Sequence, residues 1–194
     1  MDLSVFPKGA KVGFDNGPHL TVVYWPFAKK DGSAGIQSRV RIKDGVRTIA
    51  LDSVTHEVYV IQHERETLGG VILAIEFPGG GIEEGKSPLE QAKEELFEEA
   101  GVEALDAECW IQLYRDQGNT PIDGLVLTHQ HAFLALSCTQ TMAPTLDEVS
   151  SVNTLPLSEL IAMDNRNLFN DPQPAYALRR VQDWLREHRP DLLT

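Results

Sequence analysis

The chain has 194 residues, of which 42% are hydrophobic and 24% charged, and this composition suits one globular domain with a sizeable core. The net charge is −12, from 17 basic and 29 acidic side chains, so the surface repels extended nucleic acid. Cys109 and Cys138 lie far apart and form no metal-type pair, which predicts free thiols in a reducing compartment. Since the chain has neither a signal-like leader nor an apolar run of about 18 residues, we expect a cytoplasmic protein that binds no membrane.

Short β-prone segments occupy much of the first 77 residues. We predict strands at residues 19–27, 39–42, 47–51, 57–62 and 70–77. The sequence Lys43-Asp44-Gly45 between the second and third of these strands resembles a turn, so we expect those two strands to form a hairpin.

One helix is marked by signals at both of its ends. Ser87 is a favourable N-cap, Pro88 suits the first helical position, and Glu90 completes an S-x-x-E capping box. Gly101 supplies a C-terminal cap. These signals predict a helix from Pro88 to Ala100.

Further strands and two helices follow in the second half of the chain. We predict strands at residues 109–114, 125–136 and 149–155, a loop at 139–147, and helices at 158–163 and 175–188. Strands that surround one central helix, with more helices at the end, predict an α/β layered domain.

Three glutamates share one side of the predicted helix. Glu95 is three residues from Glu98 and four from Glu99, so all three side chains can converge on one point. Like charges at this spacing cost roughly 0.2–0.5 kcal/mol per pair, and the C-terminal end of a helix disfavours anions. A solvated acidic face is the alternative, but the pattern favours a bound cation of the Mg²⁺, Mn²⁺ or Ca²⁺ type. The glycines at 79–81 leave room for it, and a backbone carbonyl there is a candidate ligand.

The same segment resembles the Nudix box, G-x5-E-x7-R-E-U-x-E-E-x-G-U, in which U is an aliphatic residue. The matching residues are Gly80, Glu95, Leu96, Glu98, Glu99, Gly101 and Val102. Lys86 stands where the family has glutamate, and Glu94 stands where it has arginine. We interpret this reversal as a swapped ion pair that ties the glycine loop to the helix.

The resemblance implies a fold and a chemistry. It implies a Nudix-type α/β/α sandwich with a mixed sheet, and hydrolysis of a nucleoside diphosphate linked to another group. It further implies that Mg²⁺ or Mn²⁺ binds Glu95, Glu98, Glu99 and the carbonyl of Gly79. Glu98 and Glu99 are then the carboxylates best placed to handle the proton of an attacking water.

Segments outside the box are similar to the ADP-ribose pyrophosphatase subgroup. IEFPGG resembles its E-x-P-A-G sequence and places Glu76 before the glycine loop, and VIQHERE resembles a strand end with a substrate-binding arginine, here Arg65. The resemblance thus implies that Arg65 and Glu76 bind the substrate. Residues 145–149 match an acidic loop that supplies a catalytic carboxylate, for which we favour Glu148 over Asp147. The implied products are a nucleoside monophosphate and a sugar phosphate.

Alternative substrates and roles stay open at this point. Pro121 comes later than the proline that the ADP-ribose subgroup often has after the box, and the nearby Tyr114 is also compatible with the dinucleoside polyphosphate group. A dinucleoside polyphosphate or a nucleoside triphosphate is therefore the alternative substrate for the same site. A sensor that binds a nucleotide sugar without cleaving it is the alternative of another class. We divide the chain into a strand region at residues 1–38, which family analogy predicts to form a homodimer, and a Nudix domain at residues 39–194.

Overall fold

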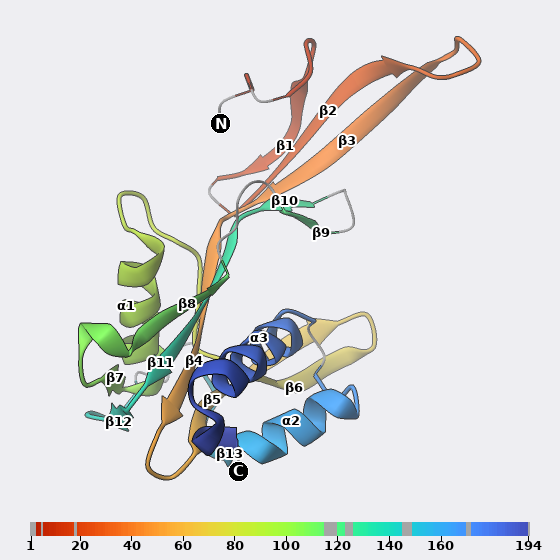
Figure 1. Cartoon of the computed structure of the whole chain (residues 1–194). Helices are drawn as coiled ribbons and strands as arrows, with labels where there is room; N and C mark the ends of the chain where they lie inside the picture. Colours follow the sequence, from red (N-terminus) through yellow and green to blue (C-terminus); the bar gives the residue numbers. More distant parts are fainter. Residues whose placement is uncertain are drawn as a thin grey trace. The chain divides into compact units, whose positions relative to one another are not determined.

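The structure is a computed structural model that describes residues 3–4, 6–17, 19–114, 120–122, 126–144, 149–169 and 172–193. The chain forms two compact units (Figure 1). Unit 1 comprises residues 1–44 and 116–130, and unit 2 comprises residues 45–115 and 131–194. Among the described residues, no helix has the length and apolar character that a membrane span requires.

Unit 1 contains a five-stranded sheet with the strand order β1-β2-β3-β10-β9. The strands are β1 (Lys11–Asn16), β2 (Leu20–Ala28), β3 (Ala34–Ile42), β9 (Thr120–Ile122) and β10 (Val126–Thr128). β2 and β3 form a long antiparallel hairpin that runs from the pair Leu20 and Ile42 to the pair Ala28 and Ala34. The sheet is mixed, because β10 pairs with β3 in parallel while its other neighbour, β9, is antiparallel.

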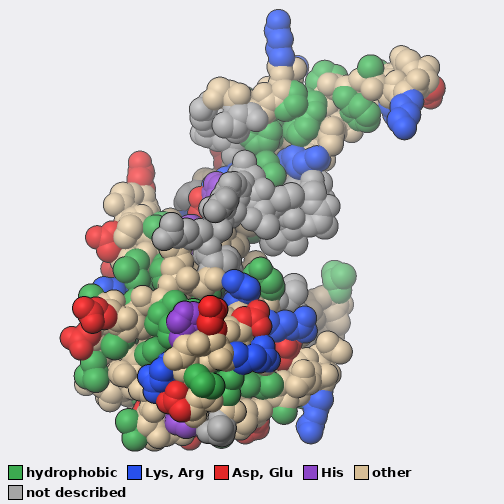
Figure 2. Space-filling model, in the orientation of Figure 1, with side chains coloured by type: hydrophobic (Ala, Val, Ile, Leu, Met, Phe, Trp, Pro, Cys, Tyr) green, Lys and Arg blue, Asp and Glu red, His purple; other side chains and the backbone are tan. Residues whose placement is uncertain are grey.

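One face of this sheet is apolar and partly exposed. Phe14, Val22, Val40 and Val126 are successive register partners on β1, β2, β3 and β10, so they form one row across the sheet. Phe14 is 56% exposed and Ile36, on the same face of β3, is 75% exposed. Figure 2 shows hydrophobic side chains at the surface of this region.

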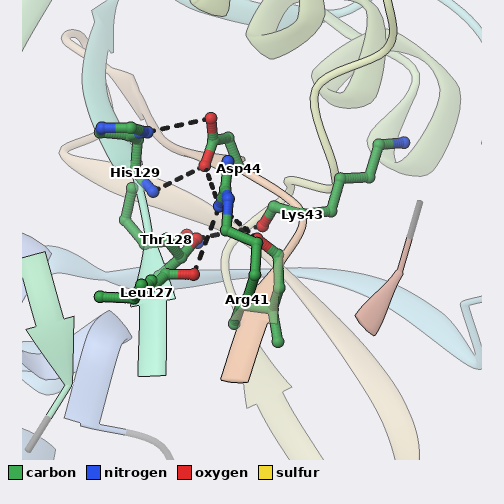
Figure 3. A network of polar contacts seen from close by, with 8 residues as sticks. Arg41, Lys43, Asp44, Leu127, Thr128 and His129 are labelled. Carbon is green, nitrogen blue, oxygen red and sulfur yellow. Dashed lines mark hydrogen bonds and ion pairs between the residues drawn. The ribbon is translucent and has the colours of Figure 1, made fainter. Parts of the chain in front are cut away.

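A polar network joins the ends of β3 and β10 (Figure 3). One oxygen of Asp44 accepts hydrogen bonds from Arg41 Nη1 at 2.6 Å and from the backbone N–H of His129 at 2.7 Å. The other oxygen lies 3.1 Å from His129 Nδ1, and the Thr128 hydroxyl donates to the Lys43 carbonyl at 3.1 Å. The network therefore fixes the two segments at which the chain leaves unit 1.

Unit 2 contains a six-stranded sheet with the order β13-β5-β4-β11-β8, in which β6 also pairs with β5. The strands are β4 (Gly45–Asp52), β5 (Glu57–Thr67), β6 (Gly70–Glu76), β8 (Trp110–Tyr114), β11 (Gln130–Leu136) and β13 (Ser151–Pro156). A two-stranded sheet pairs β7 (Val102–Ala104) with β12 (Cys138–Gln140). The helices are α1 (Pro88–Ala100), α2 (Leu157–Asn165) and α3 (Pro172–His188), with short 3₁₀ helices at Ala107–Cys109 and Pro190–Leu193.

Helices cover both faces of the larger sheet, and the alternation of strand residues explains why. Ile49 and Leu51 on β4 pack in one core cluster with Leu178 and Val181 of α3. The intervening Ala50 packs in a second cluster with residues of α1. Because successive strand residues point to opposite faces, this unit is an α/β/α sandwich, as the sequence predicts.

The ends of α1 agree with the sequence signals. The capping box of Ser87 and Glu90 is complete, and Pro88 opens the helix. Gly101 adopts the left-handed conformation with φ 66°, and its N–H bonds to the carbonyls of Leu96 and Phe97. The predicted bounds of this helix are therefore confirmed.

Several predicted strands differ from the structure. The hairpin of residues 39–42 and 47–51 is wrong, because β3 pairs with β2 and β10 while β4 belongs to the other sheet. The predicted strand at 125–136 is interrupted at His129, whose backbone N–H donates a hydrogen bond to the Asp44 side chain. Residues 11–16 were not predicted as a strand, and residues 139–140 of the expected loop pair with β7.

Candidate active site

The glycine loop is anchored to β4 through its backbone. The Pro78 carbonyl accepts the N–H of Thr48 at 2.8 Å, and the Gly80 carbonyl accepts the N–H of Val46 at 2.9 Å. Successive carbonyls of an extended segment point to opposite sides, so the Gly79 carbonyl is directed away from β4. A Cβ at Gly79 would lie 2.1 Å from the carbonyl oxygen of Val46, so this close approach requires glycine.

Glu99 is held against this loop. The Gly79 N–H donates to its Oε2 at 2.8 Å, and His63 Nε2 lies 3.5 Å from its Oε1. The side chains of Glu99 and His63 are only 12% and 9% exposed. Burial raises the pKa of Glu99 to about 7; the Gly79 N–H opposes this rise, and the charge of Glu95 adds to it.

Glu95 touches the next residue of the loop. A Cβ at Gly80 would lie 2.2 Å from Glu95 Oε1, so the carboxylate occupies the space that a side chain would fill. The buried Gln91 donates from Nε2 to Glu95 Oε1 at 2.9 Å, and its own Oε1 accepts the Glu83 N–H at 3.0 Å. Gln91 therefore fixes the Glu95 carboxylate relative to the loop.

The third glutamate of the predicted set, Glu98, is exposed on α1. Thus the structure brings Glu95 and Glu99 to adjacent loop residues, whereas Glu98 faces solvent. Across the part of the chain that the structure describes, no three His, Cys, Asp or Glu side chains gather closely enough to hold a metal ion by themselves.

The predicted swapped ion pair is confirmed. Lys86 Nζ forms an ion pair and hydrogen bond with Glu94 Oε2, and it lies 2.7 Å from Glu83 Oε2. Hydrogen bonds to Glu83 and Glu94 raise the pKa of Lys86. The reversed charges therefore join the loop to α1.

The two predicted substrate-binding residues contact each other. Arg65 donates from Nε and Nη2 to the two oxygens of Glu76, both at 2.8 Å. Glu76 is 5% exposed, while the Arg65 side chain is 49% exposed. Glu76 therefore orients Arg65, whose side chain is half exposed.

Comparison with known proteins identifies the family. Residues 42–178, which are most of the chain, match the family model described as the NUDIX domain. The chain belongs to the NUDIX domain family. It is 32% identical over 108 residues to "Nudix hydrolase 3" of Caenorhabditis elegans, and this similarity covers 53% of the chain but only 42% of the relative. The chain thus spans less than half of that relative's length.

A similar fold is found among solved structures. One described as "Crystal structure of ADP compounds hydrolase" superposes with a TM-score of 0.70 and 19% identity, over 94% of this chain and 97% of the other. At this identity the similarity supports the fold alone.

The carboxylates of the Nudix box glutamates are suitable ligands for a hard divalent cation. Their donors are oxygens, and Mg²⁺ typically takes few carboxylates and completes its shell with water and substrate phosphate. Burial raises the pKa of Glu99 and the charge of Glu95 adds to this rise, so a cation bound beside these carboxylates would favour their ionised form. Because Gly79 and Gly80 have no side chains, both carboxylates can approach the backbone of the loop closely.

The sequence analysis above does not name three residues that lie in or around the Nudix box segment in the structure: Gln91, His63 and Arg47. Gln91 was detectable, because it precedes Glu95 by four residues on the same helix. His63 and Arg47 come from β5 and β4, and only the strand order brings them here. The predicted Glu148 and its alternative Asp147 lie outside the described residues.

Proposed function

We propose that this protein is a metal-dependent Nudix hydrolase that cleaves the pyrophosphate bond of a nucleoside diphosphate linked to another group. ADP-ribose or a related nucleotide sugar is the proposed substrate, which gives a nucleoside monophosphate and a sugar phosphate. The main observation in favour is that the Glu95 carboxylate lies against Gly80 and the Glu99 carboxylate accepts a hydrogen bond from Gly79. These contacts fix the positions of two carboxylates beside the glycine loop.

We assign the residues as follows. Glu95, Glu98, Glu99 and the Gly79 carbonyl would hold Mg²⁺ or Mn²⁺, which when bound neutralises the diphosphate and acidifies a water. Glu98, which is exposed, would accept the proton of the attacking water, with Glu99 as the alternative base. Arg65, oriented by Glu76, would contact the anionic substrate. Glu148 stays a prediction for a further catalytic carboxylate.

The proposed choice of substrate is supported by a solved structure with a similar fold. The structural neighbour is described as an ADP compounds hydrolase, and this description agrees with an ADP-containing substrate. Dinucleoside polyphosphates also contain ADP, so they are the second candidate. The homodimer stays a prediction, and the partly exposed apolar face around Phe14 and Ile36 of unit 1 is a surface that a second copy would cover.

A substrate panel in which the nucleotide products are separated by chromatography tests this proposal, because cleavage of a nucleotide sugar gives two phosphomonoesters and no free inorganic phosphate. ADP-ribose, other nucleotide sugars, diadenosine polyphosphates and nucleoside triphosphates are each incubated with Mg²⁺ or Mn²⁺. We expect ADP-ribose to be cleaved fastest, and Glu99→Gln to lower kcat at least ~100-fold, because it removes one charged ligand without changing side-chain size. Glu159→Gln makes the same chemical change on the exposed surface of α2 and should leave turnover unchanged. Full activity of Glu99→Gln, or activity that persists in EDTA, would refute the mechanism.

A further inference from the structure

A buried amide lies between the glycine loop and the Glu95 carboxylate. Gln91 on α1 is 3% exposed, and its Nε2 donates to Glu95 Oε1 at 2.9 Å. Its Oε1 accepts the backbone N–H of Glu83 at 3.0 Å. The two contacts define the orientation of the amide, because an exchange of its oxygen and nitrogen would set donor against donor and acceptor against acceptor. Gln91 therefore holds one loop residue and one box carboxylate at the same time.

The hydrogen bond from Gln91 leaves the charge of Glu95 in place. An arginine or a lysine at this position would orient the carboxylate but would also cancel its negative charge, whereas an amide is neutral. The preceding residue cannot donate the bond, because Glu94 is itself a carboxylate and pairs with Lys86. A carboxylate that binds a cation needs a fixed direction and its full charge, and a neutral donor is compatible with both.

The loop has another attachment to α1, and it differs in kind. Lys86 forms ion pairs with Glu83 and Glu94, and the three side chains are between 31% and 59% exposed. Ion pairs at such exposure are weakened by solvent and salt. The Gln91 attachment is buried, carries no charge of its own, and ends on the Glu95 oxygen that lies against Gly80. It therefore acts on a carboxylate of the proposed metal set and not on the loop alone.

We propose that Gln91 is a positioning residue that acts through Glu95: it fixes this carboxylate against Gly80 without neutralising it, and thereby raises the affinity of the site for Mg²⁺ or Mn²⁺. The role rests on the metal binding that the proposed function assigns to Glu95, and it adds a residue at a position that the Nudix box leaves unspecified. Groups that hydrogen-bond to a ligating side chain typically contribute about 10–100-fold to metal affinity, and the effect of Gln91 should fall in this range.

Binding of Mn²⁺ to the protein alone tests this role. Gln91→Met keeps the length of the side chain but can neither donate to Glu95 nor accept from Glu83. Gln91→Asn keeps the amide but is one methylene shorter, so it cannot reach both partners. Mn²⁺ is titrated without nucleotide, and electron paramagnetic resonance measures the ion that stays free. We expect both variants to raise the Kd for Mn²⁺ about 10–100-fold. Gln182→Met makes the same change at a buried glutamine of α3 and should keep the wild-type Kd.

Circular dichroism with thermal melting separates this role from support of the fold. Loss of a buried hydrogen bond lowers stability at either glutamine, so the melting temperatures of Gln91→Met and Gln182→Met should both fall. A purely structural Gln91 predicts folded variants that melt earlier but bind Mn²⁺ with the wild-type Kd, and this result would overturn the proposal. If Gln91→Met does not fold, the Kd of Gln91→Asn decides, because that variant keeps a polar amide at the buried position.

The same titration separates this inference from the proposed function, because it requires no turnover. If the wild type binds Mn²⁺ and the Gln91 variants weaken this binding, the role holds even if the substrate panel is negative. Where the ion binds only together with substrate, the Mn²⁺ concentration for half-maximal turnover takes the place of the Kd. If the panel is positive but these constants are unchanged in the variants, the role of Gln91 fails and the hydrolase proposal stands. Wild-type protein that neither binds Mn²⁺ nor cleaves any compound of the panel would overturn both.

Discussion

Replacement of Gly80 by alanine should damage the site while leaving the fold intact. The added Cβ would lie 2.2 Å from Glu95 Oε1 and 2.6 Å from its Cδ. An ordinary contact begins near 3.4 Å, so the oxygen must move by about 1.2 Å. Such a displacement also breaks the 2.9 Å hydrogen bond from Gln91, because that bond ends on the same oxygen.

The expected size of the effect follows from this displacement. Misplacement of a reacting group by about 1 Å can cost about 100-fold in rate, so we expect kcat/KM of Gly80→Ala to fall by about two orders of magnitude. The backbone of Gly80 lies outside the left-handed region, and the displaced atoms belong to the end of a flexible side chain. The free energy of unfolding should therefore change by less than about 1 kcal/mol.

Gly32 in the β2–β3 turn offers the opposite control. It has φ 82° and no atom within 4 Å of an added Cβ. Gly32→Ala should lose about 1–2 kcal/mol from backbone strain and keep its turnover. Steady-state kinetics and urea denaturation are measured on both variants. Wild-type kcat/KM in Gly80→Ala, or a loss of activity that merely follows a loss of stability, would refute the assigned contact between loop and glutamate.

Two further predictions concern the ion pair and the thiols. Lys86→Glu should lower kcat/KM more than Lys86→Glu combined with Glu94→Arg, because the double variant restores opposite charges between the loop and the helix. Equal kcat/KM in the two variants would show that the ion pair does not position the loop. Burial raises the pKa of Cys138 to about 12, and this thiol is 3% exposed, whereas Cys109 is partly exposed. A thiol reagent at pH 8 should therefore label one cysteine in the native protein and two in denaturant, and mass spectrometry that finds Cys138 labelled in the native state would contradict this.

Local signals in the sequence were sufficient for the helix that holds the glutamates. The capping box, the proline and the terminal glycine act within a few residues of one another, so their effect does not depend on the rest of the fold. The ion pair of Lys86 and Glu94 was also predictable, because the reversed charges occupy two related positions of one motif.

Pairings between distant segments were not predictable in this way. Asp44 and His129 are 85 residues apart, yet their hydrogen bond interrupts one predicted strand and replaces an expected hairpin turn. Arg47 likewise meets Glu76 only because β4 supports the glycine loop that follows β6. Neither outcome has a local signal. The sequence at residues 43–45 looks the same whether or not it forms a hairpin turn, and Arg47 looks like any other arginine in a strand.

The net charge of −12 and the arrangement of the site support each other in the proposed function. A protein with this charge repels a diphosphate at distances up to the Debye length, which is about 10 Å at 0.1 M salt. Attraction must therefore arise at contact, from cations whose charge is not already neutralised by the surrounding acids. A divalent cation held by the oxygen donors of the box glutamates would supply such a charge, and the half-exposed Arg65 lies in the same unit. For this reason we expect substrate recognition to depend on the charge of a few buried groups more than on the charge of the surface.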